Sequence, residues 1–249
     1  MIQLIGAELL KLRTTRAVSG LLIATVAFTT AITAVSILTA GMDQTFSLET
    51  REGIRSVVGA PGWSLSIFVL LLGILGMAGE YRHNTITQTF LATPDRARVV
   101  AAKLVTHALA GLAFAVFAVT AGLSLALPWL ALKGVDVSAA DDIAPVVAGL
   151  LMVSPLYAVL GVAVGALLRN QVAAVIVALA WGQIVEGVFV GLLPEVGKWL
   201  PGGAAQALGS VPNPGGDLLP AWGGGLLFAA YALVLVLIGA RVVVRRDVT

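Results

Sequence analysis

The chain lacks cysteine and contains few charged residues. With no cysteine among 249 residues, it has no disulfide framework, cysteine-bound iron–sulfur site or cysteine nucleophile. Charged residues make up 11% and hydrophobic residues 59%, whereas a soluble domain carries about 25% charged residues. The mean hydropathy of +1.00 agrees with this contrast. The composition therefore excludes an ordinary soluble domain.

The N-terminus also lacks the pattern of a cleavable signal peptide. Glu8, Lys11, Arg13 and Arg16 precede the first apolar run. That run is too long for the apolar region of a signal peptide, and no small-residue cleavage site ends it cleanly. We therefore expect this run to be a membrane span.

Six apolar segments carry no Lys or Arg and meet or approach the span length of about 20 residues. Because backbone groups inside a bilayer must bond within their own segment, we expect helices. The sequence therefore predicts an all-α membrane protein with a single transmembrane domain over residues 1–249. Its six transmembrane helices are expected at about 17–40, 60–79, 104–132, 144–168, 171–193 and 221–240.

The distribution of Lys and Arg predicts the orientation of these spans. Of 15 Lys and Arg residues, four fall in the loops that would face outward, namely Arg51, Arg55, Lys133 and Lys198. The others share one side if both termini lie in the cytoplasm. The positive-inside rule therefore predicts a multi-pass protein of the plasma membrane with cytoplasmic termini. The inner residues are Lys11, Arg13, Arg16, Arg82, Arg96, Arg98, Lys103, Arg169, Arg241, Arg245 and Arg246.

Residues 1–16, MIQLIGAELLKLRTTR, place Ile2, Ile5, Leu9 and Leu12 at helical spacing, with the charged residues elsewhere. This pattern favours an amphipathic interfacial helix on the inner leaflet. The alternative is a cytoplasmic extension of the first span.

The longest polar stretch lies between the second and third spans, at residues 79–103. Thr93 as N-cap, Pro94 at the first helical position and Asp95 in the first turn predict that the third span begins there. Asn84 can cap a shorter helix before it, on which Ile86, Phe90 and Leu91 form an apolar ridge. A positively charged inner loop explains the arginines but not this ridge, which favours docking to a partner protein.

Three segments together resemble the membrane subunit of a type-2 ABC exporter, the ABC-2 permease family. They are ELLKLRTTR at 8–16, GEYRHNTITQTFLATPDRARVVAAK at 79–103 and LLPEVGKWLPGGAAQAL at 192–208. The resemblance covers essentially the whole chain, including the number, order and orientation of spans.

The resemblance implies a coupling helix at about 84–92 that sits in a cleft of a separate ATPase subunit. The residues implied in this coupling are Arg82, Asn84, Ile86, Phe90 and Leu91. The chain itself contains no G-x-x-x-x-G-K-[ST] motif, because VGKW at 196–199 lacks the first glycine and the Ser or Thr. The resemblance implies a complex of two membrane subunits and two P-loop ATPases. The ATPases bind ATP and Mg and hydrolyse the nucleotide. The two membrane subunits are expected to be copies of this chain, a homodimer in contact with membrane lipids. No nucleic acid is implied.

Glu186 is the only carboxylate inside a predicted span, with Gln183 three residues earlier. A charge at this depth is costly, so Glu186 is expected to be protonated, paired or next to a cavity. It then either lines the substrate path or dimer interface, or only bonds to a neighbouring helix. The pairs Gly161/Gly165 and Gly187/Gly191 allow close helix approach, and we give more weight to the second.

Residues 194–220 contain many Pro and Gly residues and Trp199. They predict a short helix to Leu200, a break at Pro201-Gly202-Gly203 and a second short helix. The resemblance implies a re-entrant outer hairpin between spans five and six, and the alternative is an extracellular loop anchored by Trp199.

The function predicted from these observations is ATP-driven export of a hydrophobic or amphipathic substrate, such as a drug or lipid. The chain is expected to have no catalytic site and no metal site, because His83 has no second ligand nearby and the H-E-x-x-H and G-x-S-x-G motifs are absent. An intramembrane protease would need a nucleophile–base pair or two carboxylates. The alternative function is a proton-coupled secondary transporter that uses Glu186 as carrier.

Overall fold

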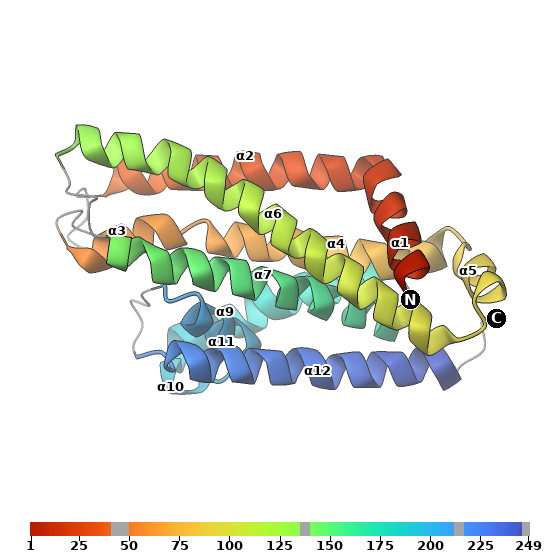
Figure 1. Ribbon diagram of the computed structural model, residues 1–249. Coiled ribbons are helices and arrows are strands. Elements are labelled where there is room, and N and C mark those ends of the chain that lie inside the picture. The colour runs from red at the N-terminus through yellow and green to blue at the C-terminus, as the bar shows by residue number, and fades with distance from the viewer. Residues whose placement is uncertain (41–49, 135–139, 212–216, 246–249) are drawn as a thin grey trace.

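The computed structural model describes residues 1–40, 50–134, 140–211 and 217–245 (Figure 1). Within these ranges the secondary structure is helical, without a β-strand. Six segments of these described ranges are long and apolar enough to cross a membrane, so the chain is a multi-pass membrane protein. The elements are α1 (Ile2–Thr14), α2 (Arg16–Thr39), α3 (Arg51–Gly59), α4 (Gly62–Arg82), α5 (Ile86–Ala92), α6 (Arg96–Leu132), α7 (Ala140–Leu168), α8 (Gln171–Leu179), η1 (Ala180–Val185), α9 (Glu186–Leu192), α10 (Pro194–Gly197), α11 (Pro201–Leu208) and α12 (Ala221–Arg245).

The spans are α2, α3 with α4, α6, α7, α8 through most of α9, and α12. This confirms the predicted all-helical fold and the six candidate spans. One predicted helix start is wrong. Asp95, rather than Thr93, is the N-cap of α6, because its Oδ1 accepts a hydrogen bond from the Arg98 backbone N–H at 3.1 Å. Pro94 therefore lies before the helix.

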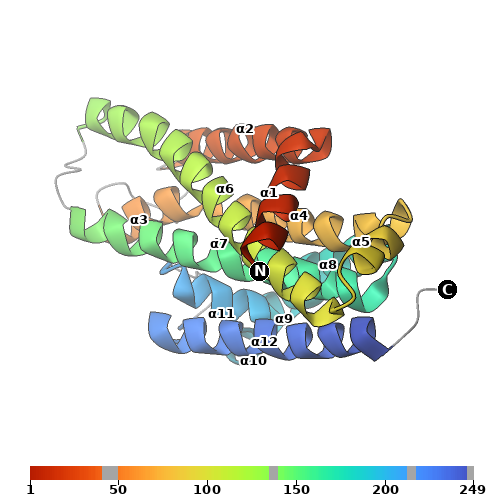
Figure 2. The same ribbon diagram turned by 45° about the vertical axis from the view of Figure 1, so that its right-hand side comes forward.

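The spans form a bundle in which α4 and α7 occupy the middle, with α2 and α6 on one side and α12 on the other (Figures 1 and 2). Helices α1 and α5 and the last turns of α12 lie at one end, which we call the α5 end. The Arg169 guanidinium, after α7, donates to the Val242 carbonyl of α12 at 2.6 Å, and so joins two helices at this end. Because the number of spans is even, α1 and the last turns of α12 lie at this same end of the bundle.

Among the described residues, the most extensive helix contact is between α4 and α7. A Cβ at Gly73 would overlap the Ala158 carbonyl oxygen, and a Cβ at Gly161 would overlap the Leu70 carbonyl oxygen. Glycine is therefore required where the two backbones meet. Of the two predicted glycine pairs, the one with Gly161 packs helices within this chain. Gly187, from the pair given more weight above, has no heavy atom within 4 Å of an added Cβ.

The N-terminal helix α1 is separate from α2, because Thr15 between them has an extended backbone conformation and the chain turns there (Figure 1). Its bounds agree with the predicted segment, and the break argues against a straight extension of the first span. Its burial pattern is the reverse of that in a soluble protein, since the apolar Ile2 and Leu9 are exposed while the charged Glu8 is buried. An apolar outer side suits a helix in contact with lipid, although its depth in a membrane stays a prediction.

Helices α10 and α11 form the predicted interrupted segment. The break falls at residues 198–200 and not at Pro201-Gly202-Gly203, because Pro201 is the first residue of α11. Helix α11 packs against α12 and α7 and buries Ala204, Ala205 and Ala207. Tyr231 of α12 donates to the Trp199 carbonyl at 2.9 Å and holds the break in place. Whether the hairpin re-enters a membrane stays a prediction.

Candidate functional site

The first candidate region is α5, which stands outside the bundle between the ends of α4 and α6 (Figures 1 and 2). Its N-cap position is occupied by Thr85. Asn84, the predicted cap, instead has a positive φ of 57° and makes the turn out of α4, a conformation that Asn tolerates better than most residues. The predicted helix is therefore present, with its start one residue later and its cap misassigned.

Of the three residues in the predicted apolar ridge of α5, two are buried and one is exposed. Ile86 and Phe90 are buried, with 2% and 9% of their surface exposed, against Met77, Val99, Val100, Val162, Ala166 and Val243. Leu91 points away from this cluster and is 77% exposed, and Arg82 and Asn84 are also exposed. The prediction that Ile86 and Phe90 form an exposed ridge is wrong, because the protein's own helices cover them. The exposed residues of α5 are Thr87, Gln88, Leu91 and Ala92.

Polar contacts also hold α5 in place. The Arg96 guanidinium of α6 lies over the Phe90 ring, 5.2 Å from its centroid, a favourable cation–π distance. Thr89 donates from Oγ1 to Glu80 Oε2 of α4 at 3.4 Å. Since α5 is anchored to both neighbouring helices, a displacement of α5 displaces their ends too.

The second candidate region is a closed ring of two carboxylates and two ammonium groups, which we call the ion ring: Glu8, Lys11, Glu80 and Lys103. Lys103 Nζ lies 2.8 Å from Glu8 Oε2 and 2.6 Å from Glu80 Oε1. Lys11 Nζ lies 2.7 Å from Glu8 Oε1 and 2.8 Å from Glu80 Oε1. Each charged group has two partners of opposite sign. Because two carboxylates face two ammonium groups, the ring as a whole carries no net charge. It joins α1, α4 and α6 at the α5 end.

The ion ring is largely buried, with Lys103 fully inside and Lys11 at its half-exposed edge. Burial works to raise the pKa of the Glu8 carboxyl, but the ion pairs with Lys103 and Lys11 outweigh it and hold the pKa below its ordinary value of 4.5. Burial works to lower the pKa of Lys11, but its bonds to Glu8 and Glu80 outweigh that and raise the pKa above 10.5. Both groups are therefore charged at neutral pH.

The ion ring was not predicted from the sequence. Lys11 and Lys103 were assigned to the positive-inside bias, and Glu8 and Glu80 had no predicted role. The sequence did contain a sign of these ion pairs, because Glu8, Lys11, Glu80 and Lys103 all lie near the cytoplasmic ends of predicted spans. Charges near span ends that cannot all face water are expected to pair with one another.

The third candidate region is a cavity of about 1190 Å³, which we call the Glu186 cavity. Its walls come from α4, α7, α8, η1, α9, α11 and α12. This is larger than the usual range of small-molecule pockets, about 300–1,000 Å³. Both predicted residues of the substrate path, Gln183 and Glu186, line it, together with the aromatic residues Trp63, Tyr157, Trp181 and Tyr231.

Glu186 is 6% exposed and accepts two hydrogen bonds. Trp181 Nε1 donates to Oε1 at 2.7 Å, and the Gly202 backbone N–H, in the first turn of α11, donates to Oε2 at 2.6 Å. A Cβ at position 202 would overlap Oε2, so this approach requires glycine. The carboxylate therefore joins the fifth span to the α10–α11 segment, which sequence reasoning did not anticipate.

A π-helical turn, η1, creates this arrangement. The Glu186 backbone N–H bonds to the Trp181 carbonyl, five residues earlier, instead of the four of an α-helix. The wider turn stacks residue 186 over residue 181, so that the Trp181 indole meets the carboxylate. Gln183, on the same turn, accepts from Trp63 Nε1 of α4 at 3.1 Å. Turns of this kind are frequent at functional sites.

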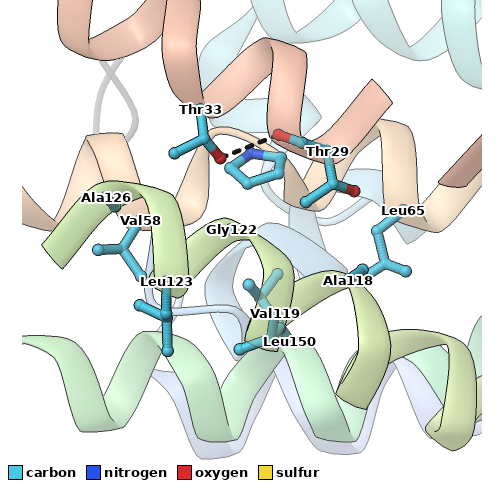
Figure 3. A pocket seen from close by; sticks show the side chains of 11 residues that line it. Thr29, Thr33, Val58, Leu65, Ala118, Val119, Gly122, Leu123, Ala126 and Leu150 are labelled. Atoms are coloured by element: carbon cyan, nitrogen blue, oxygen red, sulfur yellow. Dashed lines mark hydrogen bonds between the residues drawn. The ribbon is translucent and has the colours of Figure 1, made fainter. Parts of the chain in front are cut away.

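A second, smaller cavity of about 20 Å³ lies between α2, α6 and α7 (Figure 3). The side chains of Thr29 and Thr33 approach it from α2, opposite Gly122 and Val119 of α6 (Figure 3). Thr33 Oγ1 donates to the Thr29 carbonyl at 2.9 Å. This volume accommodates about one water molecule, so it is too small for a transported substrate.

Metal ligands do not gather in the part of the chain that the structure describes, where no group of three His, Asp or Glu side chains could hold an ion together. The chain matches none of the known protein-family models and none of the curated proteins compared with it.

Proposed function

We propose that this chain is the membrane-spanning subunit of an ATP-driven exporter of the ABC-2 type. In this proposal both termini and α5 lie in the cytoplasm, where the Lys and Arg residues of the sequence are concentrated. A separate P-loop ATPase binds the exposed face of α5. The observation that carries the proposal is the position of α5, a short helix outside the bundle with one side fixed to the transmembrane core and the other open to a partner.

The contacts of α5 supply a route from the partner to the spans. Ile86 and Phe90 pack on α4, α6, α7 and α12, while Thr89 reaches the ion ring through Glu80. Closure of two ATPases around ATP would displace α5 as a rigid body, and the attached helix ends would follow. The work comes from the different affinities of the partner for ATP and ADP, so the chain needs no bond chemistry of its own.

The Glu186 cavity supports the export part of the proposal, because its size and mostly apolar walls suit a hydrophobic or amphipathic molecule. The fifth span supports a second copy of the chain as partner. Val172, Ile176, Ile184 and Val188 along it are more than half exposed, which leaves an apolar face for a neighbouring subunit or lipid.

The first test is whether a gene for a lone P-loop ATPase lies beside the gene of this chain, and the second is to co-express that ATPase with the full chain. We expect the ATPase to copurify with the chain and to hydrolyse ATP faster in the complex. Leu91→Asp should abolish both effects, because it adds a charge to the exposed apolar side chain of α5. Ala97→Asp is the matched control, since it adds the same charge at an exposed position in the first turn of α6. Equal activity and assembly in both variants would refute the coupling role of α5.

One observation favours a second candidate, a proton-coupled transporter: Glu186 is a buried carboxylate beside a large cavity. The two functions differ in vesicles that hold the purified chain alone. A proton gradient would drive transport through the secondary transporter, whereas the exporter would be inactive without ATP and its partner.

A further inference from the structure

The charges around the Glu186 cavity are unbalanced. Among the described residues that line it, Glu186 is the one acidic side chain, and no Lys or Arg contributes to the walls. Its two hydrogen-bond donors, the Trp181 indole and the Gly202 backbone, are neutral. Each donates to a different carboxyl oxygen, which favours the ionised form, and neither supplies a counter-charge. A buried carboxylate that no protein cation neutralises is costly, so a positively charged ligand would gain binding energy here.

The aromatic lining selects the same kind of ligand. Trp63, Tyr157, Trp181 and Tyr231 come from four different elements, α4, α7, η1 and α12, and all face one cavity. The faces of indole and phenol rings carry negative electrostatic potential and attract cations, most strongly when water is excluded. The remaining walls are largely aliphatic, as in Leu70, Val153 and Leu235. A cation with a hydrophobic body would match the carboxylate, the rings and the aliphatic walls at once.

A purely structural role for Glu186 explains only part of this geometry. Its bond to Gly202 satisfies one backbone N–H in the first turn of α11, and a neutral amide acceptor could do the same. That role does not account for the π-helical turn that brings Trp181 to the carboxylate, or for the lack of any cation in the walls of so large a cavity. We therefore take the negative charge itself to be functional.

We propose that the Glu186 cavity binds amphiphilic cations, molecules that combine one delocalised or quaternary positive charge with an apolar body. That such cations are also the exported cargo rests on the function proposed above, whereas their binding does not. Glu186 supplies the counter-charge, and the rings of Trp63 and Trp181 hold the apolar body beside it.

The test uses two ions of nearly the same shape and opposite charge, tetraphenylphosphonium and tetraphenylborate. Binding is measured by equilibrium dialysis against the full chain in phosphatidylcholine nanodiscs, with empty nanodiscs subtracted to remove partition into lipid. We expect tetraphenylphosphonium to bind at least about tenfold more tightly than tetraphenylborate, as charge attraction at a low effective dielectric predicts. This comparison needs no substitution and so does not depend on how well a variant folds.

Glu186→Gln keeps the volume of the side chain and removes its charge. It should weaken tetraphenylphosphonium binding at least about tenfold and leave tetraphenylborate binding equal or stronger. Glu195→Gln is the matched control, because Glu195 on α10 is exposed and pairs with Lys198 outside the cavity; it should bind both ions like the unaltered chain. Trp181→Phe keeps a ring and the carboxylate, and it should retain the preference for the cation.

Equal affinity for the two ions, or a preference that survives Glu186→Gln, would overturn the proposal. So would the absence of binding by either ion, as expected if lipid or a second copy of the chain fills the cavity. These outcomes are independent of the ATPase. A charge preference without a copurifying ATPase would refute the proposed function alone, and an active complex without the preference would refute the cavity proposal alone.

Discussion

The ammonium group of Lys103 on α6 lies 2.6 Å from Glu80 Oε1 on α4, inside the α5 end of the bundle. The same nitrogen lies 2.8 Å from Glu8 Oε2 on α1. One side chain therefore connects three helices that are distant in sequence, and Thr89 extends the connection to α5 through Glu80. In the proposed exporter this places α1 in the same moving unit as the helix that contacts the ATPase.

Lys103→Met should strongly destabilise the protein, because it leaves Glu8 and Glu80 facing each other with only Lys11 between them. Removing one partner from a buried ion pair costs about 3–5 kcal/mol. The measurement is the free energy of unfolding in mixed micelles. Lys198→Met is the control, since its partner Glu195 is mostly exposed and such pairs contribute about 0–1 kcal/mol. Similar losses in the two variants would mean that the ion ring is not buried as described.

The double variant Lys103→Met, Glu80→Leu should recover much of that loss. It leaves Glu8 paired with Lys11 and fills the interior with apolar side chains, a replacement that is often neutral or stabilising. Unfolding is measured under the same conditions for both single variants and the double variant. Additive losses would show that Lys103 and Glu80 do not interact in the folded state.

The pH dependence of stability should show the contribution of ionised Glu8 to the folded state. Because ion pairs hold its pKa below 4.5 in the folded protein, its ionised form stabilises the fold above about pH 4.5, and this contribution is lost as the pH falls through the lowered pKa. The difference in thermal midpoint between the unaltered chain and Glu8→Gln should therefore be full at pH 7 and shrink below pH 4.5. A difference that grows on acidification would contradict the assignment.

The sequence predicted the fold well because a membrane imposes simple length and polarity rules. All six spans and the short helix α5 followed from apolar runs, Pro, Gly and charge placement, whereas the break between α10 and α11 was predicted at 201–203 and lies at 198–200. The errors at Thr93 and Asn84 are local, since several polar residues in a row can each cap a helix and only the backbone geometry selects Asp95 or Thr85.

The candidate site was less predictable because it depends on contacts between distant segments. Residue 202 meets residue 186 and residue 103 meets residue 8, and neither pair has a periodic signal in the sequence. The π-helical turn that aligns Trp181 with Glu186 has no recognised residue pattern. Ile86 and Phe90 were correctly identified as apolar positions of one helix, but their covering by Val243 of the last span could not be read from the local pattern.

Substitutions at adjacent positions of α5 should separate folding from partner binding. Phe90→Ala removes a buried ring and its contact with Arg96, so it should cost about 3–5 kcal/mol of stability without any ATPase present. Leu91→Ala should stay within about 0.5 kcal/mol, because its side chain is exposed. Unfolding of the purified chain in micelles measures both. An equally large loss of stability in the two variants would mean that Leu91 is buried as Phe90 is. Helix α5 would then lack the exposed face on which the coupling proposal depends.

Gly202→Ala should release α11 from the fifth span. The added methyl group would overlap Glu186 Oε2, so the carboxylate must move and the 2.6 Å bond to the backbone N–H is lost. Leaving a buried group unsatisfied costs about 1–3 kcal/mol, more than the helix preference of Ala over Gly, about 1 kcal/mol at most, in a first helical turn. Amide hydrogen exchange in α11 should therefore accelerate. Gly20→Ala on α2 meets no neighbouring atom, and it should leave α11 protection unchanged while stabilising the chain slightly. Unchanged exchange in Gly202→Ala would show that Glu186 does not hold α11, and the carboxylate would then be free to serve the cavity alone.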